Sequence, residues 1–129
     1  MFLLLRPQAK CQASAQAFNQ AGVSTVACGL IDTVLDNKAI SQLPEKMASL
    51  SGKNEQAIFV IVTSTVAAEQ SVLLQNKWPQ HTCFFAVGAS TGQILQQAGF
   101  TVIIPQEART EGLLALSQLH QVDNQNIII

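Results

Sequence analysis

Short runs of apolar residues alternate along the chain with longer stretches in which apolar residues recur at helical spacing. Each run is bounded by proline, glycine or polar residues, which is typical of a buried strand. The run at 57–62 is continuous, as expected for a parallel strand that is covered on both faces. The pattern predicts strands at residues 2–5, 23–28, 57–62, 83–87, 100–104 and 126–129.

The segments between these runs have the spacing of amphipathic helices. They predict helices at residues 8–21 and 66–77, from the turn at 88–91 through 98, at 110–120, and, less regularly, at 40–50. In the first helix, small apolar residues four apart predict one packed face. That face consists of Ala9, Ala13, Ala17 and Ala21, with Phe18 beside them.

Glycine, hydroxyl and proline residues mark the ends of these helices. Gly22 and Gly99 follow two of them, where glycine adopts the left-handed backbone conformation at low cost. The pair at 64–65 suits the start of a third helix, because a hydroxyl can cap its free N–H groups. Pro44 must lie in the first turn of its helix or break it. Residues 51–54 form a loop by composition.

This regular alternation of strands and helices predicts the fold class. With right-handed crossovers it gives an α/β protein built on a parallel, doubly wound sheet. If the chain contains a domain boundary, we expect it near residues 30–36. The three isoleucines at 127–129 resemble a strand that is interrupted partway, so we expect the native polypeptide to continue beyond them.

Composition excludes several classes of function. Of the 129 residues, 48% are hydrophobic and 12% charged, and the net charge is −1, so a folded domain without a nucleic-acid footprint is expected. The apolar start ends at Arg6-Pro7, too early for a signal peptide, and no run reaches the length of a membrane span. Three cysteines without paired spacing favour thiols in a reducing cytoplasm over a disulfide framework or a zinc site.

Candidate ligand-binding residues follow the predicted strands, because open α/β sheets bind ligands beyond the carboxyl ends of their strands. The loops concerned lie at residues 5–8, 63–65, 88–92 and 109–112. They combine hydroxyls, glycines and two arginines with helix N-termini, which suits carboxylate or phosphate groups. The same Ser and Thr residues could instead serve as helix caps, and for each residue alone the two interpretations are about equally weighted.

Other chemistry finds little support in the sequence. Residues 88–92 lack the lysine and the glycine spacing of nucleotide-binding loops. His81 and His120 have no partner at metal-ligand spacing and are interpreted as solvated. Glu111 and Asp32 are acid–base candidates by location alone. Trp78 is interpreted as a packing residue.

Four motifs, in order and covering nearly the whole chain, resemble those of the uroporphyrinogen-III synthases. They are the Arg-Pro strand end at 2–7, the Thr-Ser strand and helix start at 58–67, the Val-Gly segment at 86–100, and Thr-Glu-Gly-Leu-Leu at 110–114. The chain departs from the family pattern at Leu5 (usually Thr), Gly92 (usually Ala) and Thr65-Val66. It also lacks the tyrosine often discussed for the mechanism.

The resemblance implies a two-domain, flavodoxin-like architecture in a protein roughly twice this long. Residues 1–34 would form a βαβ segment belonging to a first domain, and residues 35–129 a second, incomplete α/β domain. It also implies a reaction without a cofactor. Linear hydroxymethylbilane would lose its hydroxyl, invert its D ring through a spiro-type intermediate, and close to uroporphyrinogen III. Motif matching assigns substrate binding to Arg6, Thr63, Ser64, Gly88 and Thr91.

Two alternatives remain open at this point. The chain could be a non-catalytic α/β module that binds an anion at the same loop edge. It could also be an inactive truncated fragment that forms a homodimer by exchanging segments. In every case the expected ligand is a small molecule, with no nucleic acid and no membrane as partner.

Overall fold

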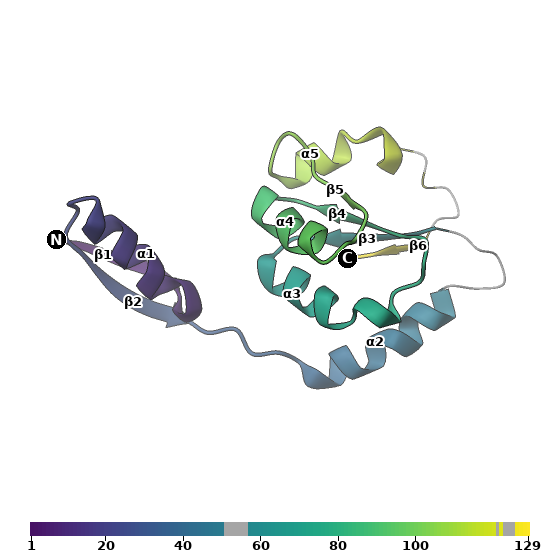
Figure 1. The fold of residues 1–129 in the computed structure, drawn as a ribbon, viewed down its shortest axis with the longest axis horizontal. Coiled ribbons are helices and arrows are strands. Elements are labelled where there is room, and N and C mark those ends of the chain that lie inside the picture. The colour runs from purple at the N-terminus through teal and green to yellow at the C-terminus, as the bar shows by residue number, and fades with distance from the viewer. Residues whose placement is uncertain (51–56, 121, 123–125) are drawn as a thin grey trace. The chain divides into compact units, whose positions relative to one another are not determined.

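The computed structural model describes residues 1–50, 57–120, 122 and 126–129. The chain divides into two compact units, Met1–Ile40 and Ser41–Ile129, and each is described by itself (Figure 1). No helix within the described residues is long and apolar enough to cross a membrane. The predicted loop at 51–54 lies outside the described residues.

The first unit is a single βαβ element. Strands β1 (Phe2–Pro7) and β2 (Thr25–Ile31) pair in parallel and are joined by helix α1 (Gln8–Gln20). Gly22, with φ at +81°, ends the helix as predicted. The second strand begins two residues later than predicted and runs three residues further.

The predicted apolar face of α1 is wrong. Cys11 and Ala15 are the buried residues of this helix, whereas the alanines four apart and Phe18 are exposed. The Cys11 thiol donates a hydrogen bond to the Leu4 carbonyl at 3.2 Å. The crossover between two paired strands therefore fixes which side of α1 meets the sheet, and the small alanine side chains add too little apolar area to override it.

The sheet of the first unit leaves much apolar surface open. An apolar cavity of about 320 Å³ lies beside β1, with Phe2, Leu3 and Phe18 in its lining. Leu30 and Ile31, at the end of β2, are also exposed. A sheet of two strands with one helix is marginal by itself.

Helix α2 spans Asn37–Leu50 and contains Pro44 in its interior. The prediction that Pro44 lies in the first turn of its helix or breaks it is therefore wrong. Asp36 caps this helix by accepting a hydrogen bond from the Ala39 N–H at 3.0 Å. Proline removes one backbone donor, which costs about 3 kcal/mol in a helix interior. Met47, on the same helix, is buried to 1% exposure, and such burial helps to offset that loss.

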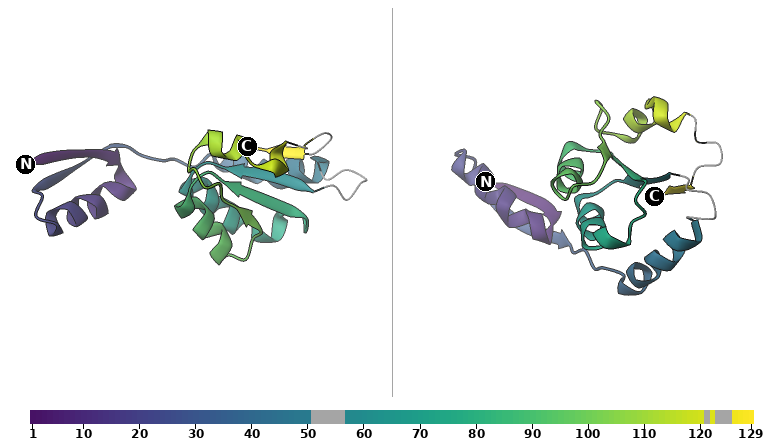
Figure 2. Two further views of the ribbon diagram at one scale, coloured as in Figure 1. Left: turned by 90° about the horizontal axis from the view of Figure 1, so that it is seen from above. Right: turned by 45° about the vertical axis from the view of Figure 1, so that its right-hand side comes forward.

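The second unit is built on a four-stranded parallel sheet in the order β5-β4-β3-β6. The strands are β3 (Ile58–Val62), β4 (Thr82–Ala86), β5 (Val102–Ile103) and β6 (Asn126–Ile128). Besides most of α2, the unit contains the helices α3 (Thr65–Leu73), α4 (Ala89–Gln97) and α5 (Thr110–Leu114). In the left view of Figure 2, α3 and α4 lie on one side of the sheet and α5 on the other. The predicted parallel, doubly wound α/β class is confirmed.

Several elements of this unit are shorter than predicted. The predicted helix 66–77 ends at Leu73 and continues as a 3-10 turn at Gln75–Lys77. The predicted helix 110–120 ends at Leu114, because Leu116 adopts an extended backbone before a second 3-10 turn at Ser117–Leu119. The predicted strand 100–104 is reduced to β5, two residues long.

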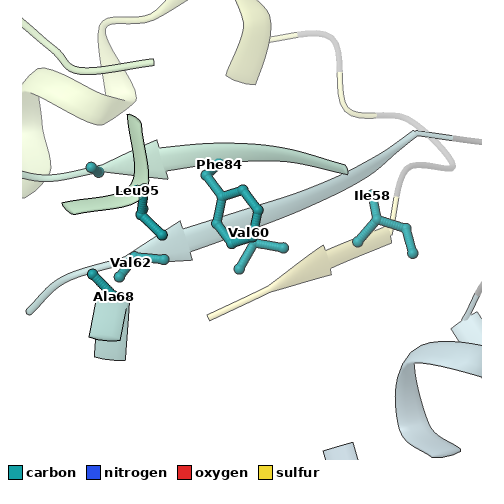
Figure 3. Close-up of a cluster of buried hydrophobic side chains, with 7 residues drawn as sticks. Ile58, Val60, Val62, Ala68, Phe84 and Leu95 are labelled. Atoms are coloured by element: carbon teal, nitrogen blue, oxygen red, sulfur yellow. The ribbon is translucent and has the colours of Figure 1, made fainter. Parts of the chain in front are cut away.

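The core of the second unit lies between β3, β4 and the inner faces of α3 and α4 (Figure 3). Ala68 and Leu95, one from each helix, lie beside Val62. Trp78 packs edge-on against Phe84 with ring centroids 5.1 Å apart, and its indole N–H donates to the Ser71 carbonyl at 2.9 Å. The packing role predicted for this tryptophan is confirmed.

Gly112 offers a direct test of the packing around α5. A β-carbon at this position would lie 2.1 Å from the Glu107 carbonyl oxygen, which belongs to the backbone and cannot rotate away. We therefore expect Gly112→Ala to lower the free energy of unfolding by about 1–3 kcal/mol in urea titrations. Gly88→Ala is the comparison variant: nothing lies within 4 Å of its added methyl group, so it should lose only the few tenths to about 1 kcal/mol of a poorer helix cap. Equal stability of the two variants would contradict this packing.

Candidate functional site

The strand order of the second unit reverses direction at β3. From β3 the chain proceeds to β4 and then β5 in one direction, and it returns to the other side of β3 with β6. Right-handed crossovers on the two sides of this reversal bring helices to opposite faces of the sheet. Ligands of doubly wound proteins bind where the direction reverses, beyond the carboxyl ends of the strands. Thr63 and Ser64 directly follow β3 at this position.

Ser64 is the N-cap of α3. Its side-chain oxygen accepts a hydrogen bond from the Ala67 N–H at 3.1 Å, and its carbonyl accepts from Ala68 at 3.1 Å. Thr63 is exposed, and its hydroxyl has no hydrogen-bond partner within the described part of the chain. The helix-cap interpretation thus holds for Ser64, whereas Thr63 presents a hydroxyl that is available to a ligand.

Gly88, the N-cap of α4, follows the adjacent strand. The Val87 N–H donates to the Val62 carbonyl at 3.1 Å, which ties together the carboxyl ends of β3 and β4. Gly88 supplies no side-chain cap, and the space that a β-carbon on it would occupy is open. The first N–H groups of α4, those of Ala89 and Ser90, are therefore left for water or a ligand.

Thr91 is buried to 5% exposure in the first turn of α4, on the same side of the helix as Leu95. Its hydroxyl makes no hydrogen bond to any residue that the structure describes. A buried hydroxyl without a partner costs about 1–3 kcal/mol. This cost is removed if water or a bound ligand reaches the hydroxyl.

Arg6 belongs to the first unit. It lies near the end of β1, is exposed, and donates a hydrogen bond from its guanidinium to the Ser14 hydroxyl. The other predicted residues, Thr63, Ser64, Gly88 and Thr91, belong to the second unit and lie at or beside the carboxyl edge of β3 and β4. The structure thus brings together four of the five.

The loop at 109–112 differs from the two loops at β3 and β4. Arg109 forms an exposed ion pair with Glu107 at 3.0 Å, so its charge is partly neutralised. Glu107 and Glu111 also line an open cavity of about 450 Å³. Two carboxylates at this cavity oppose the binding of an anion, and the arginine predicted to favour anions here does not leave the loop positive.

The reactive side chains of Cys83 and His120 lie outside the segments that carry the α3 and α4 N-termini. Cys83 is near the amino end of β4, the opposite edge of the sheet, and burial raises the pKa of its thiol. His120 is exposed, with Nε2 2.7 Å from the Leu114 carbonyl oxygen. Residues 62–66 and 87–92 contain no titratable side chain. The edge can therefore bind and orient a ligand through hydroxyls and backbone N–H groups, including those of Ala89 and Ser90, which residue-by-residue motif matching does not identify.

Comparison with known proteins relates the chain to one family model and to a curated relative. Residues 12–129 match the family model described as uroporphyrinogen-III synthase HemD. A uroporphyrinogen-III synthase of Proteus mirabilis is 29% identical over 131 residues, covering 98% of this chain and 64% of the relative. The chain therefore spans less than two thirds of the length of that relative.

The cap at Ser64 can be tested by substitution. Ser64→Ala removes the acceptor for the Ala67 N–H and is expected to lower the free energy of unfolding by about 1 kcal/mol. Ser64→Asn keeps a capping oxygen and should remain within a few tenths of a kcal/mol of the original protein. Thermal or urea unfolding measures both variants. Full stability of Ser64→Ala would show that this hydroxyl does not support α3.

Proposed function

The chain belongs to the uroporphyrinogen-III synthase family, and from this membership we propose that it acts in converting hydroxymethylbilane to uroporphyrinogen III. In this reaction the linear tetrapyrrole loses its hydroxyl group as water, its D ring is inverted, and the macrocycle closes. The protein would thus be a hydro-lyase of tetrapyrrole biosynthesis. Because the chain spans 64% of the matched relative, this activity is proposed for the protein to which these residues belong.

The observation that carries this proposal is the pair of helix N-termini at the ends of β3 and β4. Hydroxymethylbilane bears many acetate and propionate groups, and the backbone N–H groups and partial positive charge of a helix N-terminus favour carboxylates. Gly88 leaves α4 uncapped and open to approach, while Thr63 and Thr91 have hydroxyls without partners among the described residues. We assign substrate binding to Thr63, Ser64, Gly88 and Thr91, and also to Arg6 through its guanidinium.

The mechanism that fits this edge is positioning. The substrate is labile and closes spontaneously to the type I isomer, so the catalyst must mainly hold it in the geometry that leads to type III. Orientation of reacting groups alone contributes several kcal/mol to the lowering of a barrier. An edge of hydroxyls and N–H groups without titratable side chains suits this task, and we propose that no cofactor takes part.

We further propose that residues 1–34 and 35–129 belong to two different α/β domains. The open apolar sheet of the first unit supports this division, because two parallel strands with one helix need further partners. Polypeptide outside this chain would supply the missing strands. The same open sheet favours a second candidate, in which the isolated chain is an inactive fragment that pairs with another copy.

An isomer assay tests the proposed activity. The protein is incubated with freshly generated hydroxymethylbilane, the products are oxidised, and the uroporphyrin isomers are separated. Type III product above the spontaneous background is the expected result. Type I product alone, together with a concentration-dependent dimer in gel filtration, would instead support the inactive fragment.

Charge at Ser64 tests the binding edge separately. Asp and Asn both cap helices well, but Asp adds a negative charge where carboxylates are expected to bind. We therefore expect Ser64→Asp to raise KM for hydroxymethylbilane about tenfold over Ser64→Asn, at similar stability. Equal KM values for the two variants would remove the α3 N-terminus from the substrate site.

A further inference from the structure

Gly92 lies where α4 meets the sheet, and another side chain occupies the space that its missing β-carbon would fill. A β-carbon on Gly92 would lie 2.3 Å from Cδ1 and 2.6 Å from Cγ1 of Ile104, and 3.5 Å from the Ala86 methyl group. Carbon atoms in ordinary contact are about 3.5–4.0 Å apart. Gly92 is buried, and Ile104, which follows β5, is half-buried against the core.

We propose that Ile104 is a positioning residue that sets how closely the N-terminal turn of α4 sits on the sheet. This inference rests on the proposed function, because the same turn carries Gly88 and Thr91. The Gly92 N–H donates to the Gly88 carbonyl at 3.0 Å, so this bond closes the first turn of the helix. A displacement of Gly92 therefore moves Gly88, Ala89 and Ser90 with it.

The overlap between a methyl group on Gly92 and the Ile104 side chain determines how far α4 would be displaced. A methyl group on Gly92 would need Cδ1 of Ile104 to lie about 1.2–1.7 Å further away, so either that side chain turns away or the helix end rises from the sheet. Side chains packed in a core resist turning, because their neighbours occupy the alternative positions. A displacement of about 1 Å at groups that orient a substrate is large enough to change its binding.

The surroundings of Gly88 differ from those of Gly92, although both glycines lie in the first turn of α4. Gly88 lies one helical turn before Gly92, yet no atom outside its immediate neighbours in the chain lies within 4 Å of the place that a β-carbon on Gly88 would take. Gly92 thus contacts the sheet while Gly88 faces open space. A larger residue at Gly92 is therefore expected to move the N-terminal turn of α4 away from the sheet. A smaller residue in place of Ile104 should allow the turn to return.

The experiment is a double-mutant cycle in the full chain. Gly92→Ala is expected to raise KM for hydroxymethylbilane about tenfold, with kcat within about twofold. Adding Ile104→Ala removes both crowding atoms and should return KM to within about twofold of the original, although unfolding will occur at a lower temperature than in the original protein. Ile104→Val removes the nearest atom alone and should restore KM in part. Gln96→Ala, on the exposed side of α4, is the matched control.

Amide chemical shifts of Ala89, Ser90 and Thr91 give a readout that does not depend on activity. They should move in Gly92→Ala and return in the double variant. If the original protein forms no type III product, the proposed function fails, and the amide shifts alone then decide this inference. If the double variant restores neither KM nor the shifts, Ile104 does not position α4.

Discussion

The parallel pairing of β3 with β4 determines where the candidate ligand-binding groups of the second unit lie. The pairing runs from Ile58 opposite Thr82 to Val62 opposite Ala86, and the hydrogen bond from Val87 to Val62 extends it past the strand ends. Both strands then pass directly into helices, so two helix N-termini begin side by side. The register of the two strands thus places the first N–H groups of α3 beside those of α4. The hydroxyl groups of Thr63 and Thr91 lie at the same edge.

Because of this arrangement, the sequence predicts where the carboxyl edge of β3 and β4 lies. It predicts less well which groups at that edge are exposed to a ligand. Apolar runs and glycine caps are local features, and they correctly give the alternation of strands and helices and the helix ends at Gly22 and Gly99. The hydroxyl at Ser64 is also a local signal, since its capping partner lies three residues away. The burial of Thr91 depends on how α4 packs, and a linear pattern does not contain that information.

The predictions that fail do so where tertiary contacts override local patterns. The face of α1 follows the crossover between β1 and β2, although its alanines are spaced as a packed stripe. Pro44 is accommodated in a helix that buries Met47. The space beside Gly92 is filled by Ile104, twelve residues further along the chain. None of these contacts produces a regular spacing of residues in the sequence.

The absence of ionisable side chains from residues 62–66 and 87–92 has a consequence for acid and base dependence. Backbone amides and aliphatic hydroxyls do not change protonation state across the physiological range, so this edge has a constant electrostatic character from mildly acidic to mildly alkaline solution. Any titration seen in the affinity of a carboxylate for these two loops would then belong to the carboxylate itself. These two loops would bind a carboxylate through fixed backbone dipoles that do not depend on pH. The ionisation state of the ligand would then determine the pH range in which it binds.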